Sequence, residues 1–394
     1  MGIQSRLFFA AICLFLPALS AAGDFETDLK SLRYALQFSR FSDRDLEKFQ
    51  DPTRGRQEYR LGPDRAPWAG NYFPMADGGI AHRWQTPSTQ IRSGDKVGDT
   101  REHFQNMSPS LIAQLSPVEK YDLLRGRYDF PATKYELQNR GPRRDMKPES
   151  WEGFCNGVRC AGINLREPKY PVVMTNPDGI RILFEPADLK ALSGASYFYV
   201  EKYAQMGAPS REGRHESQPN AAAFDLILRF FVGEKRKAFV IDSHLGSEIW
   251  NESVIGYKRE VSAPEELTPE ERRGRPWAKS KVTVKGYLET LGEIDIVESN
   301  LETRERVAAG EIAKQVNIKY TLYLDASGQA RDGEWQNHGR YNRGVDFVWF
   351  GGGGGDDASY RNGGPRRESL DFSVIRRLFG RSQKPQCSRV LLTQ

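Results

Sequence analysis

Long apolar runs are scarce in this chain of 394 residues. The one present, L-F-F-A-A-I-C-L-F-L-P-A-L, follows an early arginine and precedes S-A-A, which predicts a signal peptide at residues 1–22 that is cleaved near Ala22. This run is short and contains proline, and no later segment offers about 18 consecutive apolar residues. We therefore expect a secreted or periplasmic protein with no membrane span.

An excess of either charge is also absent. The chain has 57 basic and 52 acidic residues, a formal net charge of +5, and its basic residues are scattered. This balance gives no reason to expect a nucleic-acid partner. The densest basic cluster, R-R-E-S-L-D-F-S-V-I-R-R-L-F-G-R, predicts an amphipathic helix near the carboxyl end with a solvated basic face.

Cysteine occurs only four times. Removal of the signal peptide leaves Cys155, Cys160 and Cys387, an odd number that fits one disulfide and one free thiol. Side chains five residues apart on a helix diverge by about 140°, so Cys155 and Cys160 should point apart. We expect a disulfide between Cys160 and Cys387 and a free Cys155. A bridge between Cys155 and Cys160 across a short non-helical turn is the alternative.

The stretch P-E-S-W-E-G-F-C-N-G-V-R-C-A-G at residues 148–162 places Cys155 at the start of a predicted helix. The first-turn N–H groups and the helix dipole would favour a thiolate there. Gly153 and Gly157 would leave room for a substrate to approach the backbone. A cysteine beside glycines is also commonly half of a disulfide or a small buried residue, so the local sequence leaves its role open.

Several motifs resemble those of one family. W-E-G-F-C-N-G is similar to the nucleophile segment of the transglutaminase elicitors, the secreted calcium-dependent transglutaminases of Phytophthora cell walls and related bacterial proteins. P-W-A-G-N-Y-F-P, L-S-P-V-E-K-Y-D, I-W-N-E-S-V-I-G-Y-K, D-G-E-W and D-F-V-W follow the family order between about Arg65 and Phe350. Short motifs in one order are far more specific than any one of them.

The motif I-W-N-E-S-V-I-G-Y-K at residues 249–258 resembles the surface peptide that plants recognise in the oomycete members. We therefore expect this segment to be largely exposed, with Trp250 turned inward.

The resemblance and the order of elements imply an α+β fold with a papain-like or transglutaminase-like core, in which the cysteine helix packs on an antiparallel sheet. The expected divisions are a signal peptide at 1–22, an N-terminal extension packed on the core at 23–130, the core at 131–350, and a Gly-rich linker with a basic tail at 351–394. Strands are predicted at 171–175, 180–184, 224–232, 238–242, 281–290, 318–325 and 347–350, with helix as an alternative for 224–232. The S-P-V-E capping box at 116–119 and the segment from Pro186 predict helices.

The family places its catalytic histidine in N-P-x-x-F-H, but here N-A-A-A-F-D puts Asp225 at that position. The family aspartate falls on Asp242 in F-V-I-D. Since an aspartate cannot supply an imidazolium partner, three alternatives remain. In the first, the enzyme is disabled and the fold serves as a binding or surface protein. In the second, His244 replaces the histidine and Asp225 orients it from a neighbouring strand. In the third, a loop histidine such as His215 or His338 reaches the site.

If the enzyme is active, the resemblance implies acyl transfer from a protein glutamine to a lysine or other amine through a thioester on Cys155. The backbone N–H of Cys155 is the natural oxyanion donor. Trp151, Trp250 and Asn251 are the candidate substrate-binding residues, with core packing as the alternative for the two tryptophans. A protease or deamidase that uses the same thioester is the alternative chemistry.

Calcium is implied by the resemblance alone. Asp356 and Asp357 follow G-G-G-G-G, but the sequence has no EF-hand loop, and a glycine run with two acids is typical of a flexible linker. We therefore name no metal ligands.

Overall fold

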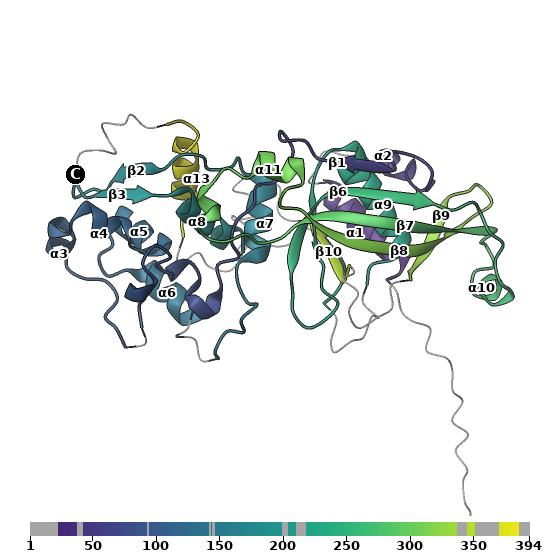
Figure 1. The fold of residues 1–394 in the computed structure, drawn as a ribbon. Coiled ribbons are helices and arrows are strands. Elements are labelled where there is room, and N and C mark those ends of the chain that lie inside the picture. Colours follow the sequence, from purple (N-terminus) through teal and green to yellow (C-terminus); the bar gives the residue numbers. More distant parts are fainter. Residues whose placement is uncertain are drawn as a thin grey trace, which may run out of the picture.

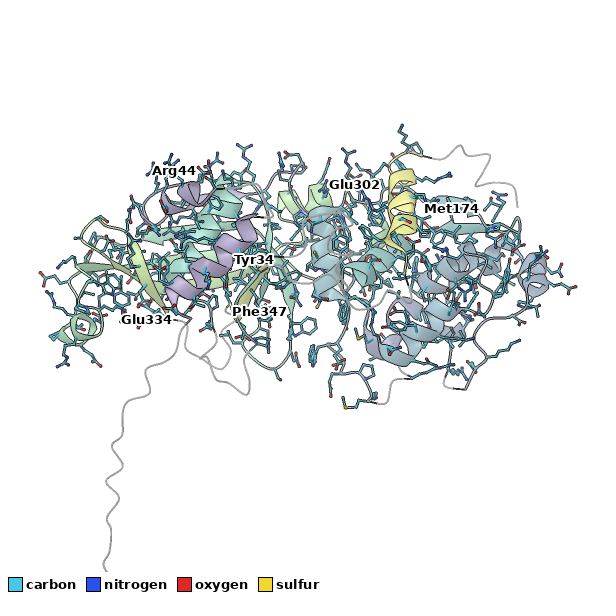
Figure 2. The ribbon with its side chains drawn as sticks, turned by 180° about the vertical axis from the view of Figure 1, so that it is seen from behind. Tyr34, Arg44, Met174, Glu302, Glu334 and Phe347 are labelled. Carbon is cyan, nitrogen blue, oxygen red and sulfur yellow. The ribbon has the colours of Figure 1, made fainter. Side chains whose placement is uncertain are left out.

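The structure is a computed structural model that describes residues 23–37, 42–92, 94–141, 143, 146–198, 204–209, 218–336, 345–350 and 370–385. The predicted signal peptide, His215, His338, the acidic pair Asp356 and Asp357, and Cys387 lie outside the described residues. The chain forms two lobes, one built on a sheet and one mainly helical (Figure 1). We call them the sheet lobe and the helical lobe. From behind, Glu334 lies in the sheet lobe, Met174 in the helical lobe, and Phe347 between them (Figure 2).

The sheet lobe is built on a curled antiparallel sheet of eight strands. Its order is β4-β10-β5-β6-β7-β8-β9, and β1 pairs with β6. The strands are β1 (Glu58–Arg60), β4 (Ala204–Gly207), β5 (Phe239–Asp242), β6 (Asn251–Val261), β7 (Ser280–Leu291), β8 (Lys314–Leu324), β9 (Ala330–Trp335) and β10 (Phe347–Phe350). The helices of this lobe are α1 (Phe25–Gln37), α2 (Asp43–Glu47), α9 (Ala221–Ile227), the π-helical η5 (Leu228–Glu234) and α10 (Pro269–Gly274). Val316, Ile318, Tyr320 and Leu322 recur every second residue in β8 and all enter one core, as strand alternation requires.

The helical lobe contains the other elements. They are η1 (Met75–Asp77), η2 (Gly79–Ala81), η3 (Pro87–Thr89), α3 (Arg101–Asn106), α4 (Pro109–Ala113), α5 (Pro117–Leu124), α6 (Pro131–Asn139), α7 (Cys155–Asn164), β2 (Val172–Thr175), β3 (Arg181–Phe184), α8 (Pro186–Phe198), η6 (Glu298–Asn300) and α13 (Phe372–Arg381). The exception is α11 (Arg304–Ala309), which buries Val307 in the core of the sheet lobe. The predicted capping box is confirmed, since Ser116 and Glu119 each accept a hydrogen bond from the other's backbone N–H. The predicted tail helix is α13, which buries Val374, Ile375 and Leu378.

Strands β5 and β10 separate two hydrophobic cores. Phe239 and Ile241 of β5 enter the core of the sheet lobe, which also receives Val348 of β10. The alternate residues Val240 and Trp349 enter the core of the helical lobe. Because side chains alternate across a strand, one face of this pair is turned toward α7 and the other toward α9.

Two predictions about β6 and α9 were wrong. Residues 224–232 form helix and π-helix, so the strand prediction is wrong and the helix alternative is confirmed; every residue of this stretch is buried. An unbroken apolar run does not distinguish a buried helix from a buried strand. Residues 251–257 are buried, not exposed, because β6 is a central strand of the sheet; Trp250 is half-buried and Lys258 is exposed.

Helix α7 lies between the lobes and packs closely on α8 (Figure 1). A Cβ atom on Gly157 would overlap the carbonyl oxygen of Gly194 in α8, and one on Gly153 would lie 2.5 Å from the ring of Tyr72. These glycines therefore admit neighbouring parts of the chain rather than a substrate. In the described ranges, no helix is both long and apolar enough to cross a bilayer.

We predict that Gly157→Ala lowers the free energy of unfolding by about 3 kcal/mol or more, because the added methyl group must push α7 from α8. Urea denaturation would measure the change. Gly380→Ala in α13 is the matched control, since nothing lies within 4 Å of its Cβ position and alanine favours helix by about 1 kcal/mol. Equal stability of wild type and Gly157→Ala would contradict the close contact of α7 with α8.

Candidate active site

Cys155 begins helix α7, as the sequence predicts, and its thiol faces the sheet. The sulfur lies 3.3 Å from Nδ2 of Asn251 and 3.9 Å from the carbonyl oxygen of Ile249. Cys155 is 9% exposed and has no disulfide partner among the described residues. The thiol therefore lies buried at the junction of the two lobes, in contact with β6 and the loop before it.

The side-chain amide of Asn251 has one orientation. Its Oδ1 accepts a hydrogen bond of 2.7 Å from Nε1 of Trp349 in β10. An indole N–H can only donate, so Oδ1 must face Trp349 and Nδ2 must face Cys155. Asn251 was predicted to bind substrate, whereas the contact with Trp349 was not predicted, since the D-F-V-W motif is the only sequence signal at that residue.

Asp242 lies directly opposite Asn251 in the pairing of β5 with β6. Opposite residues of an antiparallel pair share one face, with Cβ atoms about 5 Å apart, so the carboxyl group belongs to the same site as Cys155. Its Oδ1 accepts from the backbone N–H groups of Trp250, at 2.9 Å, and His244, at 3.2 Å. Its Oδ2 is buried with no hydrogen-bond partner among the described residues.

Burial raises the pKa of Asp242 to about 7, and the nearby carboxylates of Asp346 and Glu252 act in the same direction. The two backbone hydrogen bonds oppose this shift only in part. A carboxyl group with this pKa exchanges a proton near neutral pH, as a general acid or base must.

His244 follows β5 at the start of the 243–250 loop. Its backbone is held by Asp242, and its Nδ1 is buried with no hydrogen-bond partner in the described part of the chain. His244 is therefore close to the candidate acid in sequence, contacts it through its backbone, and is a second candidate for proton transfer.

The structure corrects the pairing of Asp225 with His244. Asp225 lies in α9, and its carboxylate contacts Arg229 at 2.6 Å, Tyr320 at 2.7 Å and Arg259 at 3.0 Å. Helix α9 packs in the core of the sheet lobe, on the face of β5 opposite to α7. Although burial by itself raises the pKa of Asp225, Arg229 and Arg259 hold it below its usual value. Asp225 therefore has a structural role and does not orient His244.

The aromatic residues near the cysteine differ from the expected pair. Trp250 packs against Tyr72, with ring centroids 5.9 Å apart, and donates a hydrogen bond to Glu248. Trp151 is half-buried and makes no ring contact with Trp250 in the described residues. Sequence analysis missed Tyr72, which comes from the N-Y-F-P stretch of the N-terminal segment.

Arg159 lies one helical turn after Cys155 and is 1% exposed. One Nη atom donates to the carbonyl oxygen of Gly70 at 2.8 Å. Burial lowers the pKa of Arg159, and Glu293, Cys155 and Glu252 oppose that shift. No sequence motif indicates that a buried cation lies behind the thiol.

Cys160 faces away from the sheet and is buried in the core of the helical lobe. Burial raises the pKa of its thiol to about 12, so it is a poor nucleophile at neutral pH. The disulfide with Cys387 stays a prediction, since Cys387 lies outside the described residues.

The described residues contain no group of three or more His, Cys, Asp or Glu side chains that would hold a metal ion. Calcium therefore stays an expectation from the resemblance, and no chemical step is assigned to it.

We predict that Asp225→Asn lowers the free energy of unfolding by about 3 to 5 kcal/mol at pH 7, because it leaves two buried guanidinium groups without a carboxylate. The pKa of Asp225 is below its usual value, so the carboxylate stabilises the fold at neutral pH and this contribution is lost as the pH falls through that lowered pKa. Urea denaturation at several pH values measures the difference. A loss that is equally large at the acid end would contradict the ion-pair account.

The same substitution at Asp242 should change the free energy of unfolding in the opposite direction. The folded pKa of Asp242 is about 7, against an ordinary value of 3.8, so its contribution is present below pH 3.8 and is lost as the pH rises through 7. Asp242→Asn should therefore raise the free energy of unfolding by on the order of 2 to 4 kcal/mol above pH 7, and the gain should vanish near pH 4. A gain independent of pH would contradict the assignment.

The chain matches the transglutaminase elicitor family over residues 140–365, which is more than half of its length. No curated protein matches it. Among solved structures, it is similar to the GP42 transglutaminase from Phytophthora sojae, with a TM-score of 0.62 and 20% sequence identity over 92% of this chain and 98% of that one. At this identity the likeness shows a shared fold. The chain belongs to the transglutaminase elicitor family.

Proposed function

We propose that this protein is an exported acyltransferase that joins a protein glutamine to an amine through a thioester on Cys155. The observation that carries the proposal is the thiol of Cys155 at the start of α7, facing Asn251 and on the same side of the sheet as Asp242. The packing of the cysteine helix against the antiparallel sheet supports a papain-like core as part of this proposal. Membership of the family supports the choice of glutamine as acyl donor.

In the first half-reaction, the thiolate of Cys155 attacks the carbon of the glutamine side-chain amide. The C–N bond of the tetrahedral intermediate breaks, ammonia leaves with a proton supplied by Asp242, and the thioester remains. The pKa of Asp242, at about 7, fits a group that holds this proton at neutral pH.

In the second half-reaction, an amine attacks the thioester carbon. The C–S bond breaks, the amine proton passes to the carboxylate of Asp242, and the thiolate of Cys155 is regenerated with a new amide bond. Water in place of the amine would give a deamidase, and a peptide bond in place of the glutamine amide would give a protease. Tyr72 and Trp250 are apolar surface for the aliphatic part of the substrate.

A catalytically inactive binding protein is the second candidate. The observation that favours it is that Asp225, which the resemblance places at the family's histidine position, is held by ion pairs with Arg229 and Arg259. On this alternative, Cys155 is a buried remnant and the fold serves as a secreted surface protein.

Incorporation of a labelled primary amine into a glutamine-rich protein distinguishes the two candidates. Wild type should incorporate the amine, Cys155→Ala should abolish incorporation, and Asp242→Asn should lower the rate by about 10² to 10⁴, because it loses the proton-transfer group. His244→Ala measures any share of the imidazole in that transfer. Each is assayed with and without calcium.

Exposed His103 provides the control, since His103→Ala should leave the rate unchanged. Asp225→His should not raise the rate, because residue 225 lies on the wrong face of the sheet. No incorporation by wild type in either condition would refute the enzyme proposal and favour the binding protein.

A further inference from the structure

Three buried side chains from distant parts of the sequence form a chain of hydrogen bonds that ends at the thiol of Cys155. Nε1 of Trp349 donates to Oδ1 of Asn251 at 2.7 Å, and Nδ2 of Asn251 lies 3.3 Å from the sulfur of Cys155. Trp349 is 3% exposed, Asn251 6% and Cys155 9%, so water competes little for these contacts.

We propose that Trp349 is a positioning residue for Cys155. By fixing the amide of Asn251, it keeps an N–H donor directed at the sulfur and so favours the thiolate over the thiol. This inference rests on the proposed function only in taking Cys155 as the nucleophile.

The sheet register explains why Trp349 can do this. Trp349 of β10 pairs with Val240 of β5, and Asn251 of β6 pairs with Asp242, two residues further along β5. Residues two apart on a strand share one face, so all four side chains lie on the face turned toward α7. The indole reaches Asn251 across the intervening strand.

The orientation of the amide decides which form of the cysteine it stabilises. With Nδ2 toward the sulfur, the amide donates to a thiolate, and a hydrogen bond to the charged form favours that form. In the flipped orientation, the amide oxygen would face the sulfur and would accept only from a thiol, while the NH₂ group would meet the N–H of Trp349. Trp349 excludes the flipped state because an indole has no acceptor.

The surrounding charges make this donor valuable. A thiolate at Cys155 would be attracted by the cation Arg159 on α7 and repelled by an ionised Tyr72 from the N-terminal segment. Several acidic groups surround the same region and would oppose a thiolate by like-charge repulsion. These acidic residues are Asp242, Glu248, Glu252, Glu293 and Asp346, and the imidazole of His244 is a further titratable group nearby. A neutral donor fixed against the sulfur offsets this repulsion without adding a charge.

The test is the rate at which iodoacetamide alkylates Cys155 as a function of pH, with Cys155→Ser giving the background from other cysteines. Trp349→Phe keeps a ring in the core but removes the N–H. It should move the midpoint of the pH profile upward by about one unit and lower the rate near pH 7 by about tenfold. Asn251→Asp still accepts from Trp349 but replaces the donor by a carboxylate oxygen, so it should move the midpoint further upward.

A double-variant cycle separates positioning from packing. If Trp349 acts through Asn251, then Trp349→Phe should have no further effect on the profile in the Asn251→Ala background. The matched control is Trp335→Phe, which removes a buried indole hydrogen bond to Pro219 in the other core. That variant should lower stability and leave the alkylation profile unchanged. Urea denaturation of each variant confirms that it is folded.

An unchanged profile in folded Trp349→Phe would overturn the inference, and so would an equal shift in the Asn251→Ala background. Alkylation needs neither glutamine nor amine. If wild type fails to incorporate amine but the profile shifts as expected, the proposed function fails and the positioning role of Trp349 stands.

Discussion

The close packing of α7 on α8 sets the position of the candidate nucleophile, Cys155, which begins α7. Gly157 meets the carbonyl oxygen of Gly194 without room for a side chain, so the position of α7 relative to α8 is fixed. In this position the first residue of α7, Cys155, contacts Asn251 of the sheet. Without this contact, the thiol would lie in one lobe and its hydrogen-bonding partners in the other.

The central sheet separates two buried aspartates with opposite electrostatic environments. Asp225 forms ion pairs with two guanidinium groups, which stabilise its carboxylate form. Asp242 has only backbone donors on one oxygen, and burial raises its pKa to about 7. The first arrangement stabilises the fold, and the second is the proton-transfer group of the proposed mechanism. Asp225, which the resemblance places at the family's histidine position, lies in α9 within the core of the sheet lobe, on the far face from Cys155.

Sequence analysis predicted the local features and failed on contacts between distant residues. The helix at Cys155 and the capping box at Ser116 follow from residues within one helical turn, and both are confirmed. For residues 224–232, strand was preferred and helix was the alternative, because an unbroken apolar run does not show the period that distinguishes the two. The hydrogen bond from Trp349 to Asn251 joins residues 98 apart, and no local pattern indicates which strands will bring such residues together.

The most direct test of the account is mass spectrometry of the acyl-enzyme. Wild-type protein is mixed with a glutamine peptide in the absence of amine, quenched in acid and digested. The account predicts that the fragment containing Cys155 gains the mass of the peptide less one ammonia, and that hydroxylamine removes the adduct as expected for a thioester. An adduct on another residue, or none on Cys155 under conditions where the peptide is consumed, would contradict it.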